Sequence, residues 1–207
     1  MKIHDKLDGI FNRGSKVKVL RFLFREEDEH TGRRIARAVG LSPSLTHSAL
    51  AELASERLIE VKEKGRSKLY RLRKDNIVVK KLLIHLFESE RGLYGDLLKE
   101  VKKGLAKAGE GVVTLAVFGS VAAKREAVGS DFDLLVVVEN TAVKKTVQGR
   151  IDRLGVSLAE RYGIALSPYI VVKGQLKGGR SKILPLIKSI QSNYKLIYGE
   201  PLERLMA

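Results

Sequence analysis

Apolar residues in the first 75 positions recur at helical spacing in successive short segments. The first of these opens with Ser15, an expected N-cap, and places four apolar side chains on one face: Val17, Leu20, Leu23 and Phe24. Thr31 is expected to cap a second, shorter helix that ends at Gly40, a residue favoured just past a helix end. This pattern predicts two short helices in succession.

A third helix and a hairpin are predicted next. Ser42 followed by Pro43 is typical of a capped first helical turn. The expected core face of this helix is Leu45, Ala49, Leu50 and Leu53. Residues 59–73 form two strand-like runs around residues 64–67, which predicts a hairpin.

Residues 76–108 have apolar positions spaced by threes, fours and sevens, which is typical of helices. Gly92 and Gly95 are expected to divide this stretch into two helices. Its apolar stripe could pack on either neighbouring domain or on a second subunit.

Beyond the Gly-containing break at 109–111 the pattern changes to strands and helices in alternation. Strands are predicted at 112–118, 133–139, 164–172 and 195–199, and helices at 141–162, 181–192 and 201–206. Pro168 inside a strand indicates an edge position or a bulge. The chain is therefore predicted to be an α+β protein with an N-terminal domain at 1–75, a helical connector at 76–110, and a mixed sheet flanked by helices at 111–207.

Composition narrows the class of protein. Of 207 residues, 44% are hydrophobic and 30% are charged, which is typical of a soluble globular chain. No apolar run approaches the ~18 residues of a membrane span, and the N-terminal residues lack an apolar signal core. The absence of cysteine excludes disulfides and thiolate metal sites. We expect a cytoplasmic protein with no membrane partner.

The net charge of +15 predicts a polyanionic partner. Residues 1–75 contain 18 Lys and Arg against 11 Asp and Glu, and residues 111–207 contain 14 against 8. The excess is thus spread over the chain and is not a basic tail. Nucleic acid is the commonest intracellular polyanion, although surface lysines that serve only solubility would give the same sum.

The N-terminal pattern suits a surface that reads double-stranded DNA. A helix in the major groove must present polar side chains outward, and those expected here are Ser44, Thr46, His47 and Ser48. The hairpin adds basic side chains suited to phosphate contact, namely Lys62, Lys64, Arg66 and Lys68. The segment resembles a winged helix-turn-helix of bacterial and archaeal regulators over about residues 12–75. The resemblance implies DNA binding, or alternatively dimerisation or protein binding.

Residues 115–139, LAVFGSVAAKREAVGSDFDLLVVVE, contain the most specific chemical pattern. Gly119-Ser120 ends a strand, and Asp131-Phe132-Asp133 leads into the next strand. Aspartates at i and i+2 of a strand point to one face, where both can coordinate a divalent metal. A glycine lets the backbone approach a phosphate closely, and a following helix N-terminus offers free amides.

This pattern closely resembles the Gly-Ser and Asp-x-Asp signature of the DNA polymerase beta-like nucleotidyltransferase superfamily, over about residues 111–200. The resemblance implies that Asp131 and Asp133 are catalytic and hold Mg²⁺ (or Mn²⁺) with the triphosphate of an NTP. It also implies that Gly119 and Ser120 bind the phosphates. Lys124 and Arg125 either assist or form a solvated face.

One departure from the family pattern concerns a third acid on the following strand. That strand reads Ile164-Ala165-Leu166-Ser167-Pro168-Tyr169, with Ser167 or Ala165 at the expected position. Glu139 at the far end of a strand and Asp152 on a helix are not convincing substitutes. Loss of a general base could lower the rate by about 10²–10⁴.

Three functions stay open on the sequence alone. The chain is either a DNA-binding nucleotidyltransferase that transfers a nucleoside monophosphate to a hydroxyl, or a regulator that binds nucleotide or a partner without turnover. The third is a toxin–antitoxin component with a toxin-like protein partner. Since winged helices often bind paired half-sites, a homodimer is the expected state.

Overall fold

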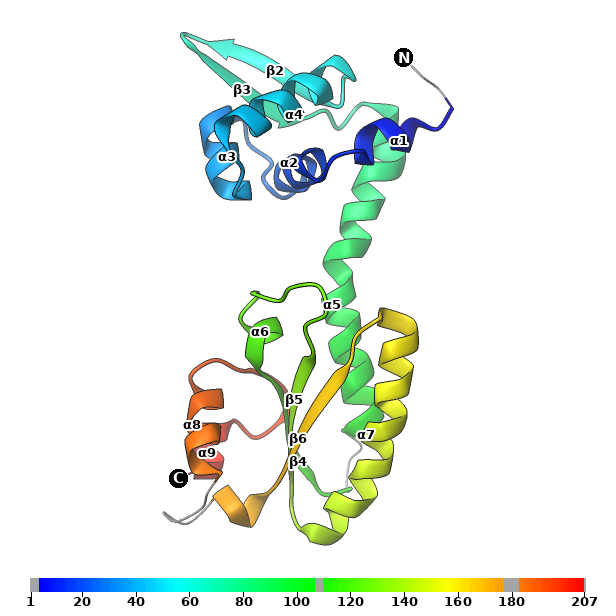
Figure 1. Ribbon diagram of the computed structural model, residues 1–207, viewed down its shortest axis with the longest axis vertical. Coiled ribbons are helices and arrows are strands. Elements are labelled where there is room, and N and C mark those ends of the chain that lie inside the picture. Colours follow the sequence, from blue (N-terminus) through cyan, green and yellow to red (C-terminus); the bar gives the residue numbers. More distant parts are fainter. Residues whose placement is uncertain (1–3, 107–109, 177–182, 207) are drawn as a thin grey trace. The chain divides into compact units, whose positions relative to one another are not determined.

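The chain forms two units, residues 1–93 and residues 94–207, in a computed structural model (Figure 1). The structure describes residues 4–106, 110–176 and 183–206. Each unit has its own apolar core. No helix in these ranges has the length and apolarity that crossing a membrane would require.

The N-terminal unit is a winged helix-turn-helix, as predicted. Thr31 and Ser42 cap their helices by accepting the backbone N–H groups of Arg34 and Leu45, and Gly40 ends the first of these helices with φ 65°. The strands pair antiparallel in the order β1-β3-β2. The elements are α1 (Lys6–Phe11), α2 (Gly14–Arg25), β1 (His30–Thr31), α3 (Gly32–Val39), α4 (Pro43–Ser55), β2 (Ile59–Lys64) and β3 (Ser67–Leu72).

Two predictions about helix positions in this unit are wrong. Helix α2 begins at Gly14 without a side-chain cap, so Ser15 lies inside its first turn. In α4, Leu45 is 54% exposed and Thr46 is 1% exposed, the reverse of the predicted orientation. The buried face has the spacing i, i+3, i+4 and i+7 and consists of Thr46, Ala49, Leu50 and Leu53. Leu45 directly precedes Thr46 in the sequence and therefore points away from this face.

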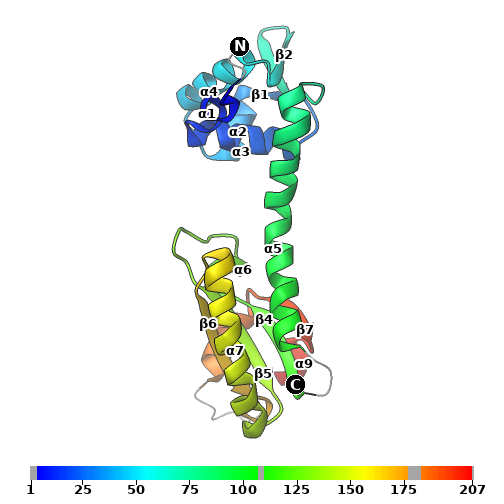
Figure 2. The same ribbon diagram turned by 90° about the vertical axis from the view of Figure 1, so that its right-hand side faces the viewer.

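The predicted connector is largely one continuous helix. A π-helical turn at Val79–Leu83 leads into α5 (Ile84–Leu105), which Figure 2 shows without a break. The expected division at Gly92 and Gly95 is therefore wrong. A helical glycine costs only about 1 kcal/mol, and burial of apolar side chains along α5 in both cores offsets it.

The C-terminal unit contains the predicted mixed sheet. In the described residues its strand order is β6-β5-β4-β7, with β5 and β6 parallel and the other pairs antiparallel. Pro168 lies on the edge strand β6, as predicted. The elements are β4 (Val112–Val117), α6 (Gly119–Ala122), β5 (Phe132–Val138), α7 (Thr141–Tyr162), β6 (Leu166–Val172), a 3-10 turn (Lys173–Leu176), α8 (Leu184–Gln191), β7 (Lys195–Gly199) and α9 (Leu202–Met206). Residues 181–182 of the predicted helix 181–192 lie outside the described residues.

Helices cover both faces of this sheet (Figure 1). On β5, Leu134 and Val136 pack in the core that contains α7 and the end of α5, whereas Leu135 and Val137 pack in the core that contains α8 and α9. Because side chains alternate along a strand, Asp133 shares the α8 face with Leu135 and Val137.

Candidate nucleotide site and DNA interface

Gly119 touches the carboxylate of Asp133. Gly119 has φ 70°, and a Cβ at this position would lie 3.0 Å from the Asp133 Cγ and closer still to its Oδ2. The backbone N–H of Phe118 also donates to the Asp133 carbonyl at 3.0 Å. The end of β4 and the start of β5 are therefore held together in a way that only glycine allows.

The helix expected after Gly119-Ser120 is a single turn. Helix α6 covers Gly119–Ala122 and is followed by Lys124 in the left-handed region, with φ 54°. The amide of Arg125 donates to the Ser120 carbonyl at 2.9 Å. Lys124 and Arg125 therefore lie beyond the helical turn, and the turn is too short to supply a row of free amides.

The two aspartates of the Asp-x-Asp pattern lie close together. Asp131 is exposed and Asp133 is partly buried. Burial raises the pKa of Asp133, and the negative charge of Asp131 raises it further, whereas a hydrogen bond from Ser167 opposes both effects. The structure therefore brings Gly119, Asp131 and Asp133 together, as the sequence predicted.

Ser167 stands opposite Asp133. In the parallel pairing of β5 with β6, Asp133 is the register partner of Ser167. Ala165 precedes β6 and accepts the Phe132 N–H through its carbonyl at 2.8 Å. Among the described residues, no three or more His, Cys, Asp or Glu side chains gather as a group that could hold a metal ion. The candidate site therefore has two carboxylates and one hydroxyl.

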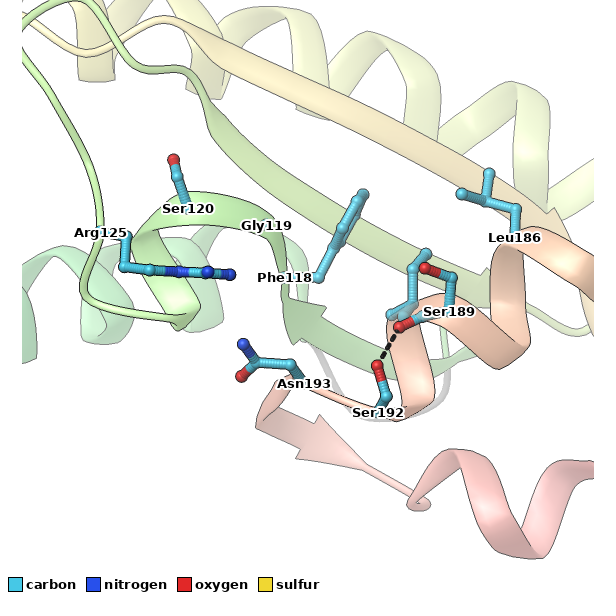
Figure 3. A pocket seen from close by; sticks show the side chains of 9 residues that line it. Phe118, Gly119, Ser120, Arg125, Leu186, Ser189, Ser192 and Asn193 are labelled. Atoms are coloured by element: carbon cyan, nitrogen blue, oxygen red, sulfur yellow. Dashed lines mark hydrogen bonds between the residues drawn. The ribbon is translucent and has the colours of Figure 1, made fainter.

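A cavity of about 610 Å³ adjoins this site (Figure 3). One wall comes from the β4–α6 segment and Arg125, and the other from α8 and the residues that follow it. The lining residues are Phe118, Gly119, Ser120, Arg125, Leu186, Ser189, Ile190, Ser192 and Asn193. Asn193 was not predicted, because no local spacing connects residue 193 with residue 119. Phe118 directly precedes Gly119 and was predicted only as the last residue of a strand.

A basic hollow in the N-terminal unit collects several of the predicted DNA-binding residues. His47 of α4 and the hairpin residues Arg66 and Lys68 line it, together with Arg33 of α3. Arg33 was missed, because its position on the shorter helix gave no signal of its own. Ser44 is exposed near the start of α4.

Two of the predicted DNA-binding residues have other contacts. Thr46 is buried, and its hydroxyl donates to the Ser42 carbonyl at 3.0 Å, so the prediction that it faces outward is wrong. The Ser48 hydroxyl donates to Glu52 at 3.3 Å. Within the described ranges, Lys64 forms no salt bridge, whereas Lys62 pairs with Glu29 at 3.3 Å.

Comparison with known proteins identifies the family. Residues 98–197 match the family model described as "Nucleotidyltransferase domain". The protein named "Putative protein adenylyltransferase MJ1305", from Methanocaldococcus jannaschii, is 32% identical over 110 residues, which cover 53% of this chain and 74% of the relative. The chain belongs to the nucleotidyltransferase domain family.

Solved structures resemble each part of the chain weakly. A crystal structure of a toxin–antitoxin with AMP-PNP is 18% identical, covers 53% of this chain and 80% of that one, and has a TM-score of 0.38. MepR, a transcription regulator of the Staphylococcus aureus multidrug efflux pump MepA, is 22% identical, covers 44% and 70%, and has a TM-score of 0.35. The fold of each unit is therefore assigned from its own elements and from the family match.

Proposed function

We propose that the C-terminal unit transfers a nucleoside monophosphate from Mg-NTP to a hydroxyl acceptor, and that the N-terminal unit binds double-stranded DNA. The observation that supports transfer best is the contact between Gly119, which has no side chain, and the carboxylate of Asp133 beside Asp131. ATP as donor and a protein hydroxyl as acceptor are the first pair to test, given the name of the archaeal relative.

The residues at this site fit a divalent cation such as Mg²⁺ or Mn²⁺. Asp131 and Asp133 supply hard oxygen ligands, and the pKa of Asp133 is raised by burial and then by the negative charge of Asp131. A bound cation would offset that repulsion, neutralise the triphosphate and polarise its α-phosphate.

Each residue of the site has a proposed part in the transfer. Asp131 and Asp133 hold the metal, while Gly119 and Ser120 bind the β- and γ-phosphates. The acceptor oxygen forms a bond to the α-phosphorus, the bond from that phosphorus to the bridging oxygen breaks, and pyrophosphate leaves with the electron pair. Ser167 supplies no carboxylate base, so the acceptor proton passes to water, and the rate is expected to be about 10²–10⁴ lower than with a base.

A second candidate function follows from Ser167. A hydroxyl opposite Asp133 completes hydrogen bonding without adding negative charge. In this alternative the unit binds Mg-nucleotide without turnover, and the protein is a regulator whose DNA affinity responds to nucleotide. A homodimer and a toxin-like protein partner remain predictions of the same scheme.

Incubation of the full chain with each labelled NTP in Mg²⁺ or Mn²⁺ tests the first candidate. We expect labelled product and pyrophosphate from the wild type and none from Asp131→Asn. If no NTP turns over but a non-cleavable analogue binds in a metal-dependent way, the second candidate replaces the first.

DNA binding is tested separately on genomic fragments at physiological salt. We expect selectivity over random DNA, and a lower affinity in His47→Ala. Equal affinity for all fragments would contradict a sequence-reading role.

A further inference from the structure

The cavity beside the carboxylates is built from two segments that are far apart in the sequence. One wall carries Ser120 and Arg125, and the opposite wall carries Leu186, Ile190 and Asn193 (Figure 3). Its volume of about 610 Å³ lies within the range of small-molecule sites, about 300–1,000 Å³. Gly119 lines the cavity and also touches Asp133, so the cavity adjoins the candidate metal site.

We propose that this cavity is the nucleotide pocket, in which Arg125 binds the phosphates and Asn193 contacts the edge of the base. The choice of Mg-NTP as ligand rests on the proposed function. The assignment of the two residues rests on the geometry of the pocket.

Arg125 is positioned on the phosphate side. Its amide donates to the Ser120 carbonyl at 2.9 Å, which fixes the start of its side chain beside the Gly119-Ser120 turn. Figure 3 shows the guanidinium extending into the pocket, and within the described ranges it forms no salt bridge. A guanidinium matches phosphate oxygens with paired N–H donors, and here it lies next to the residues proposed to bind them.

Asn193 is positioned on the nucleoside side. The Ser192 hydroxyl donates to the Ser189 carbonyl at 2.7 Å, and the backbone N–H of Asn193 donates to the Ile190 carbonyl at 3.0 Å. These bonds fix the residues after α8, while the Asn193 side chain has no hydrogen-bond partner in the described part of the chain. Its carboxamide offers both a donor and an acceptor, as recognition of a base edge requires.

Apolar side chains complete the nucleoside side. Phe118, Leu186 and Ile190 line the same cavity and offer a surface on which a planar base can lie. Ile190 is 4% exposed and belongs to the core of the unit, whereas Leu186 is 41% exposed at the mouth of this surface. The rest of the lining is polar or glycine, so the apolar surface is confined to these three side chains.

Calorimetry on the full chain tests the assignment of Arg125, with Mg²⁺ and an ATP analogue that has a non-cleavable α–β linkage. Arg125→Ala is expected to weaken binding of the triphosphate about tenfold, and to weaken AMP binding much less. Lys124→Ala is the matched control, because it removes the same charge from an exposed neighbour that does not line the pocket. Arg125→Lys is expected to retain part of the affinity.

The base contact is tested with the analogues of all four NTPs. Asn193→Ala is expected to weaken the preferred nucleotide about 3- to 10-fold and to reduce the differences among the four. Lys188→Ala is the control on α8, since its exposed side chain does not line the pocket.

The possible results separate this inference from the proposed function. If Arg125→Ala binds like Lys124→Ala and Asn193→Ala keeps the wild-type preference, the inference is overturned, although binding that is lost in Asp133→Asn still supports the metal site. If both variants behave as expected but no NTP turns over, the pocket stands and the transfer reaction fails. A wild type that binds no nucleotide overturns both.

Discussion

At the residue scale, Gly119 meets two requirements at once, a left-handed backbone and no room for a side chain, as Gly111 and Gly199 also do. It has φ 70°, and a Cβ there would collide with Asp133. Gly163, at the end of α7, has φ 66°, but a Cβ added there would meet nothing within 4 Å. Gly163→Ala should therefore cost only the strain of the left-handed backbone, about 1–2 kcal/mol.

Gly119→Ala should lower the stability by about 1–3 kcal/mol more than Gly163→Ala, because the added methyl group also collides with the Asp133 carboxylate. It should also abolish Mg-nucleotide binding by displacing the Asp133 carboxylate. Urea denaturation of both variants measures the difference. Equal losses of stability in the two alanines would contradict a close contact between Gly119 and Asp133.

Asp133 is expected to reduce the stability of the folded protein near neutral pH. Its pKa is raised by burial and then by Asp131, so between the ordinary and the raised pKa the folded state binds more protons than the unfolded state. The contribution of Asp133 to stability therefore falls as pH rises through this window. Asp133→Asn should raise the Tm at pH 7 by about 2–4 °C, with little difference below the ordinary carboxyl pKa.

The same melting curves test the metal. Mg²⁺ at millimolar concentration should raise the Tm of the wild type and leave that of Asp133→Asn unchanged. An Asp133→Asn variant that melts below the wild type at pH 7 without metal would show that the carboxylate is stabilising.

Ser167 allows the effect of a third acid to be measured. Ser167→Asp would place a carboxylate in register with Asp133, and we expect a lower Tm without metal because a third like charge is added. With Mg²⁺ the Tm should recover, and turnover should rise by about 10²-fold or more if the new group acts as a base. Ser167→Asn is the matched uncharged control. If turnover rises as much in Ser167→Asn as in Ser167→Asp, the added charge is not the cause of the gain.

At the scale of elements, a buried lysine joins α1, α2 and α4. The Lys16 side chain is 2% exposed; its ammonium donates to the Gly9 carbonyl at 2.7 Å and lies 2.8 Å from a Glu52 oxygen and 3.5 Å from a Glu56 oxygen. Lys16→Ala would remove the donor to the Gly9 carbonyl and one of the cations at Glu52 and Glu56, which keep Arg13 and Lys6, and should destabilise the N-terminal unit by about 2–3 kcal/mol. Lys16→Met fills the volume and should cost less.

Acid should reduce the difference in stability between the wild type and Lys16→Met. The hydrogen bond from Lys16 lowers the pKa of Glu52, so the pair stabilises the fold above the ordinary glutamate pKa, and this stability is lost as pH falls through the lowered pKa. The gap in Tm between the wild type and Lys16→Met should therefore narrow between about pH 6 and pH 3. A gap that is constant over this range would mean that the ion pair contributes nothing.

Local signals predicted the elements better than their packing. The caps at Thr31 and Ser42, the glycine at 40 and the edge proline were readable because each satisfies a backbone requirement within a few residues. The buried Lys16 was not predicted, because its partners are 40 residues away in sequence or lie on another helix. The break at Gly92 was predicted wrongly, because tertiary packing along α5 exceeds the local cost of glycine.

The candidate sites divide in the same way. Gly119, Asp131 and Asp133 were predictable because a short segment carries all of them, and strand alternation gives the two aspartates a common face. Asn193 reaches the same cavity only through the packing of α8 on the sheet. No spacing in one sequence could connect it with Gly119.

At the scale of the whole molecule, the net charge of +15 would attract DNA even without a specific interface. Weak binding therefore says little about a specific interface. The slope of log affinity against log salt concentration reports how many basic groups contact phosphate, because each contact adds about 0.9 to it. Lys64→Ala, Arg66→Ala and Lys68→Ala together should reduce the slope by about 2–3 and lower the affinity for all sequences.

The matched control removes the same charge from the C-terminal unit. Lys145, Arg153 and Lys188 are exposed there and form no salt bridge within the described ranges, so their combined replacement by alanine gives an equal net charge. If the hairpin is the phosphate-binding surface, this control should change the slope by less than about 0.5, whereas the hairpin variant changes it several-fold more. Fluorescence anisotropy at salt concentrations between about 50 and 300 mM measures both slopes. Equal changes in the two variants would mean that DNA responds to overall charge and not to the winged helix, and the winged helix would then be left without a DNA-reading role.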